Sequence, residues 1–227
     1  SAVQMGPNIL AYDPATGTYP VNPLLGTQPN PYSLLNNIDK GRTDRFLGNI
    51  YVEARPIDGL TLRVNAGLDR ANISRKTYEP KSTLYGRNLQ GNADIYTRDN
   101  NQYLLEATAT YAKTFKDIHK VNLLAGTSYE QFNVESVNSG NNNFLLDGFG
   151  YNNLNAGTGT KRVGSGFSKN KMESYFFRVN YILKDRYYLT GTLRADGASV
   201  FAKNHKWGYF PSAALGWTFS EEPFMKS

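Results

Sequence analysis

The residues of this chain that could carry chemistry are few and scattered. Its 227 residues include two histidines and no cysteine, which excludes disulfides and thiolate metal sites. His119 lies in a predicted turn and His205 in a predicted loop, and neither has an acidic partner at metal-ligand spacing. Glu221 and Glu222 are adjacent carboxylates at the end of a predicted strand. All four side chains are therefore interpreted as solvated surface groups.

Nucleophilic and phosphate-binding motifs are also missing from the sequence. The glycine-rich stretches 157–160 and 164–166 lack the Lys-Ser/Thr pair and the helix that a phosphate loop needs. There is no Gly-x-Ser-x-Gly elbow, and no Ser-His-acid set has sequence support. We therefore expect no catalytic residue, no metal site and no cofactor, and we predict that the chain is not an enzyme.

One charged segment is distinctive, Arg194-Ala-Asp-Gly-Ala-Ser-Val-Phe201. In a functional interpretation, which requires that the strands described below close into a barrel, Arg194 and Asp196 face its lumen near a substrate path. In a structural interpretation, Asp-Gly forms a turn and Arg194 pairs with an acid across strands. We favour the structural interpretation.

Alternating apolar and polar residues predict the strands that position these charges. Seven such stretches follow residue 43: 46–55, 60–69, 103–111, 121–129, 175–183, 187–195 and 209–219. One face of these strands holds 36 positions without a single Asp, Glu, Lys or Arg, whereas the other face carries nine charges. One side of the predicted sheet therefore avoids water and the other side does not.

The connections between these strands alternate in length. Those after the first, third and fifth strands have about three to six residues, whereas 70–102 and 131–173 are about thirty to forty residues long, and outer-membrane barrels have short periplasmic turns and longer extracellular loops. Aromatic residues on the charge-free face fall near both strand ends, as in the girdles of such barrels. We predict an all-β fold, an antiparallel transmembrane β-barrel segment of about seven strands.

A soluble β-sandwich that acts as an adhesin or glycan-binding module is the alternative, because it also alternates apolar and polar faces. In a sandwich the charge-free face packs on a second sheet, whereas in a barrel it contacts lipid. The net charge of +6 comes from scattered Lys and Arg without a dense basic run, so we expect no nucleic-acid partner.

The C-terminal third contains an ordered series of motifs. They are Arg178-Val-Asn-Tyr-Ile-Leu-Lys-Asp-Arg-Tyr-Tyr-Leu189, Leu193-Arg-Ala-Asp-Gly-Ala-Ser199, Lys206-Trp-Gly-Tyr-Phe-Pro-Ser212, Leu215-Gly-Trp217 and Ser220-Glu-Glu222. The series resembles the barrel of SusC/RagA-type TonB-dependent outer-membrane transporters, as do Asn22-Pro-Leu24, Thr43-Asp-Arg-Phe-Leu-Gly-Asn49 and Gly59-Leu-Thr61 upstream. Two positions depart from the family pattern, Ala198 where Ser is usual and Ala202 where Gly is usual.

The resemblance implies a barrel of about 22 strands with a plugged lumen, in the outer membrane of a Gram-negative bacterium. Residues 1–42 would form an extracellular loop segment, and 43–227 a partial barrel whose plug and remaining strands lie outside this sequence. The implied function is import of glycans or oligosaccharides, or of peptides, into the periplasm. The implied partners are a SusD-like surface lipoprotein, the TonB complex acting through the missing plug, and outer-membrane lipid.

The resemblance also assigns the charged face to the lumen or, as we favour, to the plug that fills it. The residues expected there are Glu53, Arg63, Asp69, Glu106, Arg178, Arg194 and Asp196. Aromatic residues of the long connections could stack on sugar rings or anchor the loops. Those expected as substrate contacts are Tyr85, Tyr96, Phe149 and Tyr151.

Overall fold

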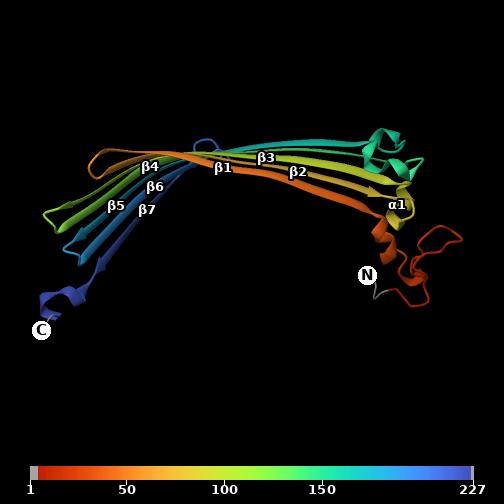
Figure 1. Cartoon of the computed structure of the whole chain (residues 1–227), viewed down its shortest axis with the longest axis horizontal. Helices are drawn as coiled ribbons and strands as arrows, with labels where there is room; N and C mark the ends of the chain where they lie inside the picture. Colours follow the sequence, from red (N-terminus) through yellow and green to blue (C-terminus); the bar gives the residue numbers. More distant parts are fainter. Residues whose placement is uncertain (1–4, 226–227) are drawn as a thin grey trace. The chain divides into compact units, whose positions relative to one another are not determined.

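A computed structural model describes residues 5–225 of the chain, which form seven strands and one short α-helix with several 3-10 turns (Figure 1). All seven strands belong to one sheet, in which each strand is hydrogen-bonded to its neighbours in chain order. The strands are β1 (Ile38–Ile57), β2 (Leu60–Glu79), β3 (Asn92–Phe115), β4 (His119–Asn142), β5 (Arg162–Leu183), β6 (Tyr187–Ala198) and β7 (Trp207–Trp217).

This architecture confirms the all-β prediction and does not match the β-sandwich alternative. Apart from two isolated bridges, residues 5–225 contain no strand outside this one sheet. The helix α1 spans Leu84–Leu89. Within the same residues, no helix has the length and apolar content needed to cross a membrane.

The chain divides into two compact units, and β1 to β5 each contribute residues to both. We call the first the loop unit; it contains the described residues up to Arg45, together with Ala71–Asp99 and Val134–Phe167. We call the second the sheet unit; it contains Phe46–Arg70, Asn100–Asn133 and the described residues from Ser168 onward.

Two hairpins of the sheet unit share the same turn chemistry. Lys116 and Asp117 have φ values of 50° and 57°, and Lys184 and Asp185 both have φ of 55°. Positive φ at both central residues defines the type I′ turn, whose twist matches that of the strands it joins. Aspartate tolerates this left-handed conformation better than most residues, so two Lys-Asp pairs suffice to close the hairpins.

The turn between β1 and β2 depends on a glycine. Gly59 has φ of 82°, and a Cβ at this position would lie 2.5 Å from the carbonyl oxygen of Ala112. The Gly59 carbonyl also accepts a 2.8 Å hydrogen bond from the Ala112 amide. Glycine is therefore needed both for the backbone conformation and for the close approach of β3.

The connections after β2 and β4 are shorter than the sequence pattern predicts. β2 continues to Glu79 before β3 begins at Asn92, and β4 continues to Asn142 before β5 begins at Arg162. Most of the stretches 70–102 and 131–173 is thus paired strand rather than loop. The prediction was wrong because it ended each strand where charged residues appear on the charge-free face. Backbone pairing continues beyond these residues, since it does not depend on the polarity of the side chains.

The first strand also begins earlier than predicted, at Ile38. The preceding segment is held by the buried side chain of Asn30. Its Nδ2 donates to the carbonyls of Leu10, Ala11 and Pro20 at 3.2, 3.2 and 2.9 Å, and its Oδ1 accepts from the Tyr32 amide at 3.0 Å. One amide thus satisfies several backbone groups of a segment that has little regular structure of its own.

The buried apolar residues all belong to the loop unit. Tyr78, Ala93 and Phe144 are 1%, 0% and 2% exposed, and the rings of Tyr78 and Phe144 meet edge to face at 5.7 Å. Tyr151 and Leu154, from the turns after β4, pack against this cluster. Among the described residues of the sheet unit, no hydrophobic side chain is buried.

Candidate functional site

The side chains of the sheet unit contact one another in two separate sets, one on each face of the sheet. On one face, Tyr175 stacks on Trp207 at 5.8 Å and Tyr187 on Trp217 at 6.5 Å. The register of β5 with β6 places Phe177 opposite Leu193 and Tyr181 opposite Leu189. All of these residues except Trp207, which precedes the predicted seventh strand, belong to the predicted charge-free face, so the strand register agrees with the alternation in the sequence.

The other face carries a charged cluster centred on Arg194 of β6. Its Nε donates to both carboxylate oxygens of Asp196, at 2.8 and 2.9 Å, and its Nη2 donates to the hydroxyl of Ser174 at 3.2 Å. Ser174 is fully buried and lies directly opposite Asp196 in the register. Arg194 is paired with an acid, but this acid is two residues away on the same strand and not across strands as expected. The expected Asp-Gly turn is also wrong, because Asp196 and Gly197 are paired residues within β6.

An aromatic ring extends this cluster across the sheet. The Arg194 guanidinium carbon lies 5.8 Å from the centre of the Phe176 ring. Phe176 lies so close over β4 that a Cβ on Gly126 would be 2.4 Å from its ring. Glu106 of β3 interacts electrostatically with Arg194. The structure thus brings two of the predicted residues, Arg194 and Asp196, into direct contact, with Glu106 within electrostatic range of Arg194.

A second arginine on this face has the same kind of partner. The Arg63 guanidinium carbon of β2 lies 4.0 Å from the centre of the Tyr51 ring of β1, within the range of a cation–π contact. Glu53, two residues farther along β1, accepts a 2.8 Å hydrogen bond from Arg55. Glu53 and Arg63 therefore lie on one hairpin, each with its own neighbour.

The remaining predicted residues of this face are more dispersed. Asp69 lines a shallow groove of about 260 Å³ with Asn49, Gly67 and Gln102, among others. Arg178 of β5 is exposed and lies opposite Thr192 of β6. The charged face is thus a series of local networks along the sheet rather than one convergent site.

The aromatic residues predicted as loop contacts lie in different surroundings. Tyr85 belongs to α1 and is 50% exposed, Tyr96 belongs to β3 and is 37% exposed, and Phe149 is 48% exposed. Tyr151 packs against the buried cluster around Tyr78, and the Lys76 ammonium lies 5.8 Å from its ring centre. Tyr151 therefore anchors a loop, whereas Tyr85 and Phe149 present open ring surface.

Sequence reasoning missed the neutral partners of the two arginines. Tyr51 and Phe176 are large aromatic residues at charged-face positions, and Phe176 lies opposite Arg194 in the register. An aromatic residue at such a position is a usable signal, because a ring can take an arginine across a strand pair. Nothing in the sequence indicates that Gly126 is the residue that makes room for the Phe176 ring.

The chemistry available to these groups is recognition and packing. The described residues contain no group of three His, Cys, Asp or Glu side chains able to hold a metal ion. In the loop unit, Arg75 forms a two-pronged pair with Asp39 at 2.9 and 2.6 Å, which lowers the pKa of Asp39. Burial and the 2.7 Å hydrogen bond to Asp147 raise the pKa of the Tyr78 phenol. Both groups therefore keep their ordinary charge near neutral pH.

The turn after β7 holds a carboxylate with several donors. Glu222 accepts hydrogen bonds from the Tyr187 hydroxyl at 2.7 Å, the Trp217 indole at 3.0 Å and Arg186 at 3.2 Å. The bonds from Tyr187 and Trp217 are the main causes that lower the pKa of Glu222. Contrary to the interpretation from sequence, Glu222 is not a solvated turn residue, because it is only 7% exposed.

This chain is similar to TonB-dependent receptors. Residues 4–222 match the family model described as TonB dependent receptor-like, beta-barrel. The TonB-dependent receptor P3 of Formosa agariphila is 34% identical over 227 residues, which are 100% of this chain and 22% of that protein. The TonB-dependent receptor SusC of Bacteroides thetaiotaomicron is 30% identical over 218 residues, which are 92% of this chain and 20% of that protein.

A solved structure has the same fold as this sheet. The RagAB peptide transporter superposes with a TM-score of 0.79 at 20% identity, over 87% of this chain and 22% of that one. At this level of identity the likeness concerns the fold alone. The chain spans about a fifth of the length of the curated relatives it matches.

Proposed function

Since this chain belongs to the TonB-dependent receptor β-barrel family, we propose that it forms part of the wall of an outer-membrane transporter that imports nutrients into the periplasm. The observation that carries the proposal is the sheet unit, an antiparallel sheet with one charge-free face and one charged face and no buried apolar core of its own. Such a sheet suits a membrane, because exposed apolar side chains are stable in contact with lipid but unfavourable in contact with water.

In this proposal the sheet unit spans the bilayer. The charge-free face contacts lipid, the tight turns at Gly59, Lys116 and Lys184 lie at the periplasmic side, and the loop unit lies outside the cell. The 36 charge-free positions support this placement, since a basic side chain on the lipid face at mid-membrane costs about 2–4 kcal/mol.

The charged face would then line the lumen and contact the plug. Arg194 and Asp196 already neutralise each other, and Arg63 is held over the Tyr51 ring. Charged side chains that already have partners within the sheet form no strong bonds to a neighbouring domain. Such a surface would allow the plug to move against it. For this reason we assign them to contact with the plug, through which the TonB complex would act, rather than to a fixed substrate site.

We propose oligosaccharides or peptides as the substrates and a SusD-like surface lipoprotein as the partner. Two observations support the proposal: the TonB-dependent receptor SusC is among the relatives, and the RagAB peptide transporter has the same fold. On the loop unit, Tyr85 and Phe149 present exposed rings of the kind that stack on sugars. They are the loop residues that we assign to substrate contact.

Fractionation of cells that produce this segment in its complete barrel tests the membrane assignment. The protein should stay in the outer-membrane fraction until detergent is added, and its release by salt or alkali alone would refute the proposal. Uptake of labelled oligosaccharides and of labelled peptides, compared between cells with and without the gene, then identifies the substrate class. Loss of neither uptake would refute the assignment to these two classes.

A further inference from the structure

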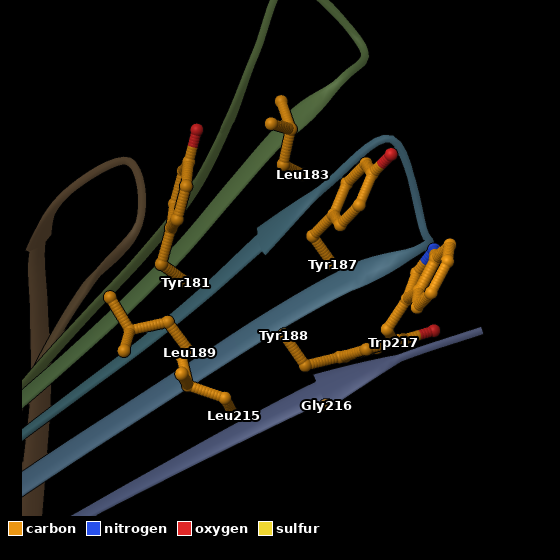
Figure 2. A pocket seen from close by; sticks show the side chains of 8 residues that line it. All are labelled: Tyr181, Leu183, Tyr187, Tyr188, Leu189, Leu215, Gly216 and Trp217. Carbon is orange, nitrogen blue, oxygen red and sulfur yellow. The ribbon is translucent and has the colours of Figure 1, made fainter. Parts of the chain in front are cut away.

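An apolar groove crosses β5, β6 and β7 near their turn ends. It has a volume of about 570 Å³, and its lining includes Tyr181, Tyr187, Leu189, Leu215 and Trp217. Figure 2 shows two rows of side chains along the groove, with Tyr181, Leu189 and Leu215 in one row and Leu183, Tyr187 and Trp217 in the other. The groove lies within the sheet unit, on its charge-free face.

The strand register explains why a groove forms at this place. Leu189 lies opposite Leu215, and Tyr187 opposite Trp217. Even-numbered residues of β6 carry the hydrogen bonds to β7, as at Ala198 and Arg186, so both of these pairs are non-hydrogen-bonded pairs, in which side chains come closest. The two aromatic rings therefore stack, at 6.5 Å and 7°, beside a floor of shorter leucine side chains.

The polar tips of the aromatic walls are already satisfied by the protein. The Tyr181 hydroxyl is hydrogen-bonded to His119 Nδ1 at 2.6 Å. The Tyr187 hydroxyl and the Trp217 indole N–H both donate to Glu222. The groove consequently presents carbon to its occupant, and hydrocarbon can fill it without leaving a donor unpaired. The bonds to Glu222 leave the Tyr187 hydroxyl and the Trp217 indole without a free O–H or N–H to donate to a sugar or peptide.

We propose that this groove is a binding site for one acyl chain of a phospholipid of the inner, periplasmic leaflet. The inference rests on the proposed function, because it requires the charge-free face to lie in lipid. Tyr and Trp at strand ends mark the membrane–water boundary of barrels, and the Lys184-Asp185 turn directly follows Leu183 of the groove wall. An inner-leaflet chain would enter the groove alongside the strands, past the rings and onto the leucine floor.

The charged residues at the rim of the groove indicate that the protein recognises the acyl chain of the phospholipid rather than its head group. Lys120 is paired with Asp185 at 2.6 Å, and Arg186 with Glu222 at 3.2 Å. Two of the cations nearest the groove are thus already neutralised. We expect phosphatidylethanolamine and phosphatidylglycerol with the same chains to be retained equally.

Native mass spectrometry of the complete barrel, released from a non-ionic detergent after addition of either phospholipid, tests the proposal. We expect the unmodified protein to retain one phospholipid more than the variant Leu189→Trp, whose indole fills the groove floor. The matched control is Leu193→Trp, on the same strand and the same face but outside the groove, which should retain the same number as the unmodified protein.

Equal retention by Leu189→Trp and the unmodified protein would overturn the assignment, as would equal loss in Leu193→Trp. Retention of phosphatidylglycerol alone would also overturn it, because the head group would then be the recognised part. A dimer that disappears in Leu189→Trp would identify the occupant as a second copy of the protein. A protein that is soluble without detergent would instead refute the proposed function itself.

Discussion

The loop unit and the sheet unit bury their apolar residues in different ways. In the loop unit, Tyr78 and Phe144 are shielded by the turns that follow β4. In the sheet unit, residues of the same kind remain open, for example Leu193 at 52% and Leu215 at 85% exposed. The same strands supply both units, so under the proposed function the difference lies in the solvent that surrounds each unit. Water requires a protein cover over apolar side chains, whereas lipid does not.

The sequence shows a change in charge along the strands at the boundary between the two units. When the alternation of each strand is followed from its charge-free face toward the loop unit, charged residues return near the boundary of the sheet unit. The first of these on β1 to β5 are Asp44, Arg70, Asp99, Glu135 and Glu173. Five strands thus lose their charge-free face near the same boundary, as the proposed membrane placement of the sheet unit requires.

The largest effect should come from removing the cover in the loop unit. Phe144→Ala leaves a cavity beside Tyr78, and truncation of a buried phenylalanine costs about 3–5 kcal/mol. Hydrogen exchange should show loss of protection in the ends of β2 and β3 that carry Tyr78 and Ala93. Phe149→Ala, in the same loop but 48% exposed, should change little. Equal effects of the two variants would show that the loop unit has no packed core.

The next effect should appear on the charge-free face of the sheet unit. Ala107→Arg places a charge in mid-membrane and should destabilise the barrel by about 2–4 kcal/mol. Thr108→Arg, the adjacent residue on the charged face, should cost much less. Urea unfolding of the complete barrel in lipid vesicles measures both. A larger loss for Thr108→Arg would reverse the assignment of the two faces.

The smallest effect should be an acid dependence of the turn after β7. Hydrogen bonds from Tyr187 and Trp217 lower the pKa of Glu222, so this contribution is present above the unfolded pKa of about 4.3. It is lost as the pH falls through the lower folded value. Amide protection factors at 218–222 should therefore fall in acid. In Glu222→Gln these protection factors should be low at every pH, whereas in Glu221→Gln they should follow those of the unmodified protein. Protection factors that do not change with pH in the unmodified protein and in Glu221→Gln would contradict this role of Glu222.

Much of the sheet unit could be predicted from the sequence because the side-chain period of a strand is two. A charge-free series such as Leu60 to Leu68 identifies both the strand and its charge-free face. The pattern could not find the strand extensions that reach Glu79 and Asn142, since paired backbone tolerates charged side chains on both faces. Nor could it find the role of Glu222, whose donors Tyr187 and Trp217 come from two different strands.

The sequence by itself determined which face of each strand is free of charge, because alternation and charge are local properties of the chain. It also determined the family, through motifs such as Lys206-Trp-Gly-Tyr-Phe-Pro-Ser212. Only the tertiary structure decided which residues meet across strands, as where Phe176 lies over Gly126 beside Arg194, and Leu189 and Leu215 form the floor of a groove. Those contacts depend on the stagger between strands, which hydrogen bonding between distant parts of the chain sets.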